Sequence, residues 1–235
     1  MKCLKFFGKI WTTVYIVALV LLIVTASIAL PIYIRPFYYA HIDRLDLVEQ
    51  TGHTEEEIRQ AYGEVLDYLT FPDKEFGTGV FKWSEDGKQH FDDCKPWFML
   101  NATVLLASAV FVLCVMLDRK RRIPLSRPLG LRPSAFAGGL TLVAFSAIGA
   151  FVAADFENAF WLFHDLLFPG KDNWQFDAAR DEIINALPEE FFMSCAVCIC
   201  ASILVISLIL LISGIVARGR EKRKANKLQA AESAE

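Results

Sequence analysis

Charge is missing from four long stretches of this 235-residue sequence. No Asp, Glu, Lys, Arg or His occurs in four segments of 20 to 26 residues, which cover 10–34, 97–117, 135–154 and 191–216. A helix rises about 1.5 Å per residue, so about 20 residues cross a hydrocarbon core of about 30 Å. The sequence therefore predicts an all-α membrane protein with four transmembrane helices.

The first uncharged stretch also has features of a cleaved signal peptide. Lys2, Lys5 and Lys9 precede it, and small residues lie near its end. The apolar region of a signal peptide is only about 7–15 residues long, however. Because 10–34 is longer, we expect it to remain in the protein as a membrane anchor.

Positive charge is scarce in two of the segments that connect these helices. The N-tail 1–9, the loop 118–134 and the C-tail 217–235 hold 15 Lys and Arg and 4 acidic residues, for a net charge of +11. The loops 35–96 and 155–190 hold 9 cations and 23 acids, for a net charge of −14. Positively charged connections stay in the cytoplasm. We therefore expect both termini inside and both large loops outside, where they form a small helical extracellular cap.

The basic C-tail has two interpretations. A cationic segment next to a membrane helix is typical of a flank that faces anionic lipid, and less often of a nucleic-acid site. We favour the lipid-facing flank and expect no nucleic acid as a partner.

Cysteine is too sparsely placed outside the spans to form a disulfide framework. Of six cysteines, only Cys94 clearly lies in a predicted outer loop. Cys195, Cys198 and Cys200 are closely spaced, but they lie in an apolar span and lack a second pair of ligands for a metal site. We interpret them as structural residues and expect no metal site.

Several catalytic motifs are also absent. There is no Gly-x-Ser-x-Gly turn for a serine nucleophile, no His-Glu-x-x-His for zinc and no glycine-rich phosphate loop after a strand. Glu189 and Glu190 lack the arginine of the intramembrane Glu-Glu-x3-Arg proteases. What remains is proton-transfer chemistry at the lipid surface, and we expect no cofactor.

The loop 35–96 contains one clear helix signal. Thr54 and Glu57 have the spacing of a capping box, and apolar residues follow at helical spacing until Pro72. These apolar positions are Ile58, Ala61, Tyr62, Val65, Leu66 and Leu69.

The loop 155–190 begins with a short apolar helix. Its apolar residues cover nearly every face, and it is too short to span before Pro169 and Gly170 break it. We expect Asp177 to cap a following helix that contains Ile183. Pro188, with Glu189 and Glu190, suits the first turn of the fourth span.

Two of the four histidines have ordinary explanations. His53 precedes the Thr54 cap and reads as a loop residue. His41 and Asp46 match the His-x4-Asp spacing of glycerolipid acyltransferases, but those enzymes act on the cytosolic side. A match of two common residue types is weak, so we favour a structural role for His41.

The other two histidines lie beside predicted spans. His90 comes just before the second span and His164 just after the third, so both should approach the outer leaflet from different loops. Histidine both gives and accepts a proton near neutral pH. Residue types alone leave two readings open, a paired functional site and two satisfied polar groups at the membrane interface.

Three motifs in this order resemble those of a known family. Residues 90–95 read HFDDCK, similar to His-x-x-Asp-Val-Lys with Cys94 in place of valine. Residues 163–168 read FHDLLF before Trp174, similar to Phe-His-x-x-Phe-Phe followed by tryptophan. Residues 181–189 read DEIINALPE, similar to Asp-x-Ile-Ile-x-x-Leu-Pro-Glu. Over nearly its whole length the chain resembles the bacterial lipoprotein intramolecular transacylases.

The resemblance implies a reaction and its residues. Members of this family move the sn-2 acyl chain of a diacylglyceryl lipoprotein to the α-amine of its first cysteine, which gives the lyso-form. The implied catalytic pair is His90 and His164, one as base and one as acid, in an order that the sequence does not reveal. Asp93, or its neighbour Asp92, is the candidate to orient His90, and Trp174 and Asp181 support the site by their place in the motifs.

One position departs from the family pattern. A glutamate often stands three residues before the first histidine, whereas this sequence has Gly87 there. Whether Glu85 takes over its role stays open at this point.

Two other functions compete with acyl transfer. One is a non-enzymatic four-span sensor or assembly partner whose acidic cap binds another protein. The other is a lipid hydrolase that uses the same histidine pair.

Overall fold

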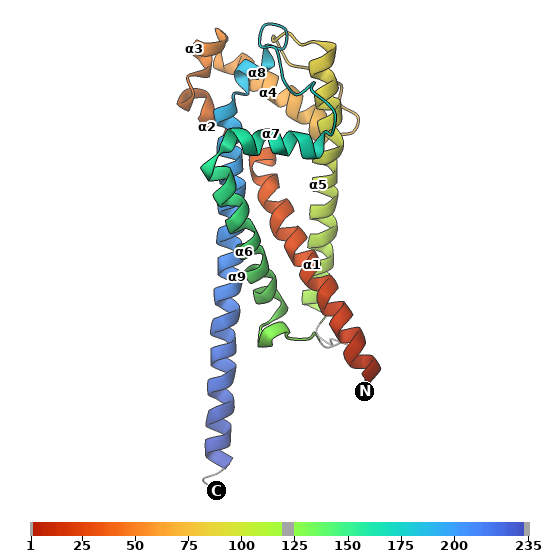
Figure 1. Ribbon diagram of the computed structural model, residues 1–235, viewed down its shortest axis with the longest axis vertical. Helices are drawn as coiled ribbons and strands as arrows, with labels where there is room; N and C mark the ends of the chain where they lie inside the picture. The colour runs from red at the N-terminus through yellow and green to blue at the C-terminus, as the bar shows by residue number, and fades with distance from the viewer. Residues whose placement is uncertain (1, 119–124, 233–235) are drawn as a thin grey trace. The chain divides into compact units, whose positions relative to one another are not determined.

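The computed structural model describes residues 2–118 and 125–232, and of residues 2–5 only the backbone. The described residues form α-helices and one 3-10 turn, without a strand. Within these described residues, four helices are long and apolar enough to cross a membrane: α1 (Lys2–Tyr33), α5 (Glu85–Leu117), α6 (Pro133–Ala154) and α9 (Glu189–Glu232) (Figure 1). The predicted all-α class with four spans is confirmed. Arg119, Lys120, Arg121, Arg122 and Glu235, which entered the charge argument, lie outside the described residues, as do the side chains of Lys2, Cys3 and Lys5.

The chain divides into two compact units, and each long helix contributes to both. The first comprises Met1–Val24, Leu105–Ile148 and Cys200–Glu235. The second comprises Thr25–Val104 and Gly149–Ile199, and it contains all four histidines.

Helix α4 (Glu55–Thr70) of the second unit forms as its sequence predicts. The Thr54 hydroxyl accepts a hydrogen bond from the Glu57 backbone N–H at 3.3 Å, and the Glu57 carboxylate accepts one from the Thr54 N–H at 2.8 Å. This reciprocal capping box satisfies two N–H groups that the first turn leaves without partners. The predicted helix is thus confirmed, with its apolar face buried at Ile58, Ala61, Tyr62, Val65, Leu66 and Leu69.

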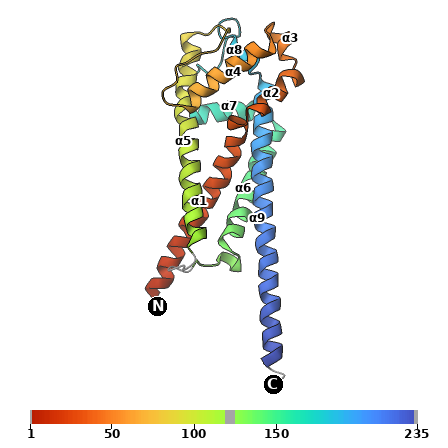
Figure 2. The same cartoon turned by 180° about the vertical axis from the view of Figure 1, so that it is seen from behind.

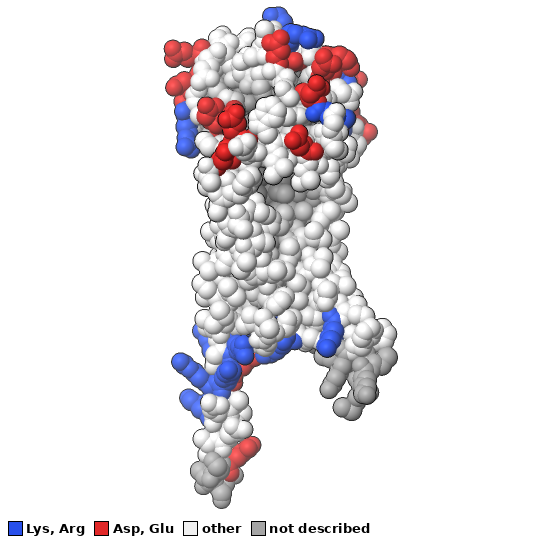
Figure 3. Space-filling model, viewed as in Figure 1, with Lys and Arg blue, Asp and Glu red and all other residues white. Residues whose placement is uncertain are grey.

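One hydrophobic core joins residues of the two predicted loops. It includes α2 (Arg35–Arg44), α3 (Leu47–Thr51), α4 and α8 (Ile183–Ala186), which both views show gathered together (Figures 1 and 2). The Tyr38 ring stacks on Tyr62 with centroids 3.8 Å apart, and its hydroxyl donates to the Ala186 carbonyl at 2.7 Å. Acidic side chains lie over the surface of these helices (Figure 3). The extracellular location of this predicted cap stays a prediction.

Helix α5 begins well before its uncharged part at 97–117. Ser84 caps it, because its hydroxyl accepts from the Gly87 N–H at 3.1 Å. Ser84 is itself held by the carboxylate of Asp181, to which it donates from its backbone N–H at 2.7 Å and from its hydroxyl at 2.9 Å. His90 therefore lies on a rigid helical extension outside the uncharged segment.

The loop 155–190 is only partly as expected. The predicted short apolar helix is present as α7 (Phe156–Leu167), capped by Asp155 and ended near Gly170, whose φ is +74°. The expected helix cap at Asp177 is wrong. Asp177 accepts from the Ala179 N–H at 3.0 Å in a turn, and α8 starts only after Glu182, without a side-chain cap. Helix α8 is a single turn that ends shortly before Pro188. Glu189 and Glu190 occupy the first turn of α9, as predicted.

In the first unit, α6 and α9 approach closely at glycines. A Cβ on Gly138 would lie 2.6 Å from the Ser207 backbone oxygen, and one on Gly214 would lie 2.2 Å from the Ala135 Cβ. Small residues allow helix backbones to come together in a membrane, where dispersion contacts drive association. Glu221, on the basic extension of α9, pairs with Arg127 and Arg132.

This close approach makes Gly138→Ala a test of the helix packing. The added methyl meets a backbone oxygen that cannot rotate away, so the variant should lose about 1–3 kcal/mol of stability. Gly219→Ala is the control, because Gly219 is a helical glycine of the partner helix α9 and no atom of the described residues lies within 4 Å of an added Cβ. We expect a lower melting temperature in detergent for the first variant only, and equal melting temperatures would contradict the packing.

Candidate active site

The structure brings His90 and His164 together within the second unit. His90 projects from α5 and His164 from α7, and both side chains are buried. Their ring centroids lie 5.9 Å apart, and the ring planes are inclined by 37°. The predicted proximity of these two histidines, 74 positions apart in the sequence, is thereby confirmed.

His164 is fixed by one hydrogen bond and one stacked ring. Its Nδ1 lies 2.8 Å from the Phe160 carbonyl, four residues earlier on α7. A carbonyl oxygen only accepts, so Nδ1 carries the proton and the neutral ring has its lone pair on Nε2. The indole of Trp174 stacks on the imidazole at 4.3 Å with planes 21° apart. Burial lowers the pKa of His164 and favours the neutral ring.

His90 lies in a more apolar environment. The rings of Phe168 and Phe176 meet it edge-on at centroid distances of 5.0 and 5.5 Å. Its Nε2 lies 3.4 Å from the Cys94 sulfur, whereas its buried Nδ1 has no hydrogen-bond partner in the part of the chain that the structure describes. Burial, with a smaller effect from His164, lowers its pKa from 6.5 to about 4. Both imidazoles are therefore neutral near pH 7.

Asp93, expected to orient His90, bonds elsewhere. Its carboxylate accepts from the Lys171 ammonium at 2.5 Å and from the Asn173 amide at 3.1 Å. These residues flank the turn whose Lys171 carbonyl accepts from the Trp174 indole N–H at 3.1 Å. Asp93 thus ties α5 to the segment that presents Trp174 to His164.

Asp92, the alternative partner, also bonds away from the histidine. It accepts from the Tyr68 hydroxyl and, at 2.9 Å, from Lys88. The prediction that Asp93 or Asp92 orients His90 by a direct contact is therefore wrong. The side chain within hydrogen-bond distance of the His90 ring is that of Cys94. Helical spacing alone could have indicated this contact, since side chains four positions apart share one helix face.

Asp181 explains why glycine stands at position 87. A Cβ on Gly87 would lie 2.2 Å from the Asp181 carboxylate oxygen that accepts from Ser84. The space beside Gly87 is therefore filled by a buried carboxylate from the end of the second loop. Glu85 does not replace the missing glutamate, because its side chain is 81% exposed and lies 3.9 Å from Lys88.

The remaining two histidines lie elsewhere in the second unit. His41 is buried against Phe37 and Phe191, and its Nδ1 bonds the Phe37 carbonyl at 2.7 Å. His53 lies 3.7 Å from the Glu57 carboxylate and packs on Phe81. The structural readings of both residues agree with these contacts.

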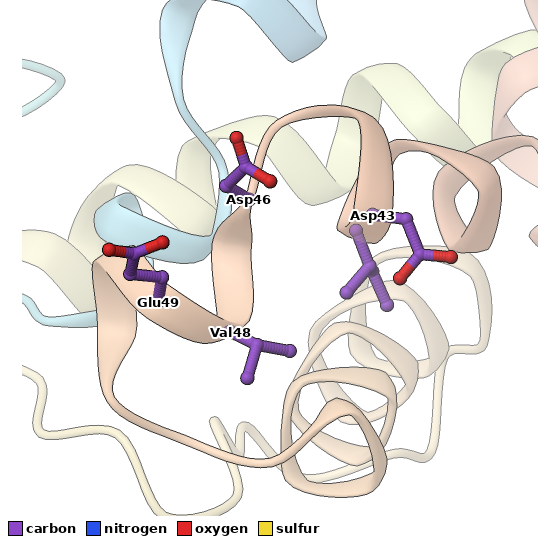
Figure 4. A pocket seen from close by; sticks show the side chains of 5 residues that line it. Asp43, Asp46, Val48 and Glu49 are labelled. Atoms are coloured by element: carbon purple, nitrogen blue, oxygen red, sulfur yellow. The ribbon is translucent and has the colours of Figure 1, made fainter.

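A pocket on α2 and α3 is separate from the paired histidines. It is lined by Ile42, Asp43, Asp46, Val48 and Glu49. Figure 4 shows the carboxylates of Asp43, Asp46 and Glu49 among the side chains that line it. Neither His90 nor His164 contributes to it.

Comparisons with known proteins identify the family. The family model of the lipoprotein intramolecular transacylase Lit matches residues 13–192. The chain belongs to the Lit family. It is therefore an acyltransferase of the lipoprotein intramolecular transacylase type and a multi-pass integral membrane protein.

Solved structures of Lit agree with this assignment. The integral membrane Lit of Bacillus cereus is 28% identical, with a TM-score of 0.81 over 94% of this chain and 99% of the other. A variant of that protein with a histidine replaced by arginine is 27% identical, with a TM-score of 0.74 over 94% and 96% of the two chains. Another, with that histidine replaced by alanine, has a TM-score of 0.75. A search of the curated proteins finds no match.

Burial of His90 predicts that stability depends on pH. The folded pKa of about 4 lies below the ordinary value of 6.5, so the unfolded chain binds a proton first as the pH falls. Above pH 6.5 the ring is neutral in the folded and the unfolded state, so its protonation does not affect stability. Between pH 6.5 and 4 the free energy of unfolding falls by about 3 kcal/mol. His90→Gln should flatten this part of the curve of melting temperature against pH.

Gln175→Ala is the control for that measurement. Gln175 is exposed and has no charge to titrate, so the variant should keep the wild-type slope. A wild-type slope in His90→Gln would show that the buried imidazole does not cause the loss of stability at acid pH.

Proposed function

We propose that His90 and His164 perform the acyl transfer of this Lit-family enzyme. The substrate is a diacylglyceryl lipoprotein, and the sn-2 acyl chain moves to the α-amine of its first cysteine. The observation that carries the proposal is the pair of neutral, buried imidazoles 5.9 Å apart, which come from two different loops.

The reaction needs alignment more than chemical activation. The ester and the amine belong to one molecule, and well-aligned intramolecular attack lowers a barrier by about 7–11 kcal/mol. Attack forms an amide C–N bond and breaks the bond between the acyl carbon and the sn-2 glycerol oxygen. One proton leaves the nitrogen, and one reaches the glycerol oxygen.

His164 suits the role of proton carrier. The Phe160 carbonyl holds its Nδ1 proton, so Nε2 is the basic atom. Nε2 takes the proton of the attacking amine and then delivers it to the departing glycerol oxygen, after which the ring is neutral again. Proton transfer by a positioned side chain contributes about 10²–10⁴-fold.

His90 suits a different role. A neutral imidazole that gave up its single proton would become an imidazolate, which a buried apolar environment opposes. We therefore assign His90 as a hydrogen-bond donor to the carbonyl oxygen, where negative charge develops during attack. Its pKa of about 4 keeps it neutral, so it does not serve as a cationic acid.

Helix α7 offers an apolar face for the lipid. Trp161, Leu162, Phe163 and Leu166 are each 44–76% exposed, although their side chains are bulky and apolar. Such a helix lies in the membrane interface with its apolar face towards the acyl chains. We propose that this face guides the acyl chains to His164 on the same helix.

Charge supports an orientation with the site outside. The acidic loops hold both histidines, and the basic segments hold both termini. By the positive-inside bias the termini are cytoplasmic and acyl transfer takes place at the outer leaflet of the bacterial cell membrane.

Substitution of either histidine tests the catalytic pair. In a bacterial host that lacks lyso-form lipoprotein, the wild-type protein should produce it, as detected by mass spectrometry of lipoprotein N-terminal peptides. His90→Ala and His164→Ala should each lower this product by about 100-fold or more. His53→Ala is the matched control and should retain activity.

The products separate the alternatives. A transacylase conserves both acyl chains on the lipoprotein, whereas a hydrolase releases free fatty acid. A sensor or assembly partner produces neither. Lyso-form production that survives in both alanine variants at normal membrane levels would remove the histidines from the mechanism.

Reporter fusions test the orientation. Alkaline phosphatase becomes active only outside the cytoplasm, so fusions after Lys74 should be active. Fusions after Ser126, in the basic loop, should be inactive. The reverse pattern would place the histidine pair at the inner leaflet.

A further inference from the structure

The thiol of Cys94 contacts the ring that the proposed mechanism uses as a hydrogen-bond donor. Cys94 follows His90 by one helical turn on α5, and its sulfur lies 3.4 Å from Nε2 of the imidazole. This is the one hydrogen bond recorded for either side chain among the described residues, and Nδ1 of His90 is buried without a partner. His90 itself is only 6% exposed.

The direction of this hydrogen bond follows from counting unsatisfied groups. If the thiol donates to Nε2, the thiol proton and a ring lone pair are both satisfied, and only the Nδ1 proton lacks a partner. If Nε2 donates to sulfur instead, the thiol proton and the Nδ1 lone pair both lack one. Each buried polar group without a partner costs free energy, so donation by the thiol is favoured.

The protonation states agree with this direction. Burial raises the pKa of Cys94 to about 12, and burial lowers the pKa of His90 to about 4. The pair is therefore a neutral thiol and a neutral imidazole at pH 7. A thiolate beside an imidazolium, the form in which cysteine is a nucleophile, is disfavoured on both sides.

We propose that Cys94 is a positioning residue that holds His90 as the tautomer with its proton on Nδ1. The thiol donates to Nε2, which leaves the Nδ1 N–H as the group that meets the carbonyl oxygen of the substrate. Because Nδ1 is covered by protein atoms, the oxygen reaches it only after neighbouring side chains move. The functional part of this inference rests on the proposed role of His90, whereas the tautomer itself does not.

The proposed role also distinguishes cysteine at position 94 from the valine of the related motif. The related motif has valine there, which cannot donate a hydrogen bond. With valine, the choice between the two tautomers of His90 is left to the surrounding packing. In this chain the choice is set by one hydrogen bond within a single helix.

NMR of the purified full-length protein with ¹⁵N-labelled histidine reads the tautomer without substrate. The His90 signals are assigned as those lost in His90→Gln. In the wild type, Nδ1 should give the signal of a protonated ring nitrogen and Nε2 that of an unprotonated one. Cys94→Val should shift the tautomer ratio about fivefold towards Nε2–H, as expected for loss of one hydrogen bond, and Cys94→Ser should restore the wild-type ratio.

Activity provides the second measurement. Cys94→Val should lower the rate of lyso-form production about fivefold or more, and Cys94→Ser should recover most of it. Cys114→Val is the matched control, since Cys114 lies exposed on the same α5 and away from His90 in sequence. It should leave both the NMR spectrum and the rate unchanged.

The outcomes separate this inference from the proposed function. An Nε2–H signal in the wild type, or one tautomer ratio in wild type and Cys94→Val, would overturn the role of Cys94 even if His90 is essential. A hydroxylamine-sensitive acyl group on Cys94 would overturn it as well, because the thiol would then be a nucleophile. A tautomer shift together with a fully active His90→Ala would support the contact and overturn the mechanism instead.

Discussion

Burial of two imidazole rings beside one another is the constraint on which the site depends. Water is excluded around His90 and His164, and a charge on either ring is disfavoured by burial. A neutral imidazole has one donor and one acceptor, so the chemistry of each ring is decided by which nitrogen carries the proton. Each choice is set by a partner one helical turn away, the Phe160 carbonyl for His164 and the Cys94 thiol for His90. Burial thus keeps both rings neutral, and the hydrogen-bond partner of each ring then selects its tautomer.

The scaffold holds the two rings through contacts that involve neither ring directly. Asp181 fixes Ser84 at the start of α5, and Asp93 fixes Lys171 and Asn173 beside Trp174. Both carboxylates therefore act on the backbone segments that present the histidines. Neither carboxylate hydrogen-bonds His90, where such a contact would favour the cation. The charge of Asp93 still raises the pKa of His90, but burial lowers it by more.

The sequence was sufficient for the spans, for the capped helix at α4 and for the proximity of His90 and His164, because these depend on local patterns. Uncharged runs, a capping box and three ordered motifs are readable without coordinates. The partner of Asp93 was not readable, since Lys171 is 78 positions away and the contact exists only after α7 folds back. The extent of α8 was also missed, because Pro188 and the turn at Asp177 leave one turn of helix between them. The use of glycine at position 87 likewise depends on Asp181, which arrives from the other loop.

His41 shows why a local pattern alone does not define an active histidine. Like His164 it is buried, and its Nδ1 bonds the carbonyl four residues earlier on its own helix. Its second nitrogen, Nε2, is also buried and has no hydrogen-bond partner within 2–118 and 125–232, as is the case for Nδ1 of His90. Its ring neighbours, however, are Phe37 and Phe191, whereas the ring of His164 meets a second imidazole. A single histidine with one fixed tautomer supplies a basic nitrogen, but it does not also supply a hydrogen-bond donor to the oxyanion. In the proposed mechanism acyl transfer therefore requires two histidines, which two converging helices bring together. That convergence, more than the chemistry of either histidine, distinguishes the α5–α7 pair from the rest of the molecule.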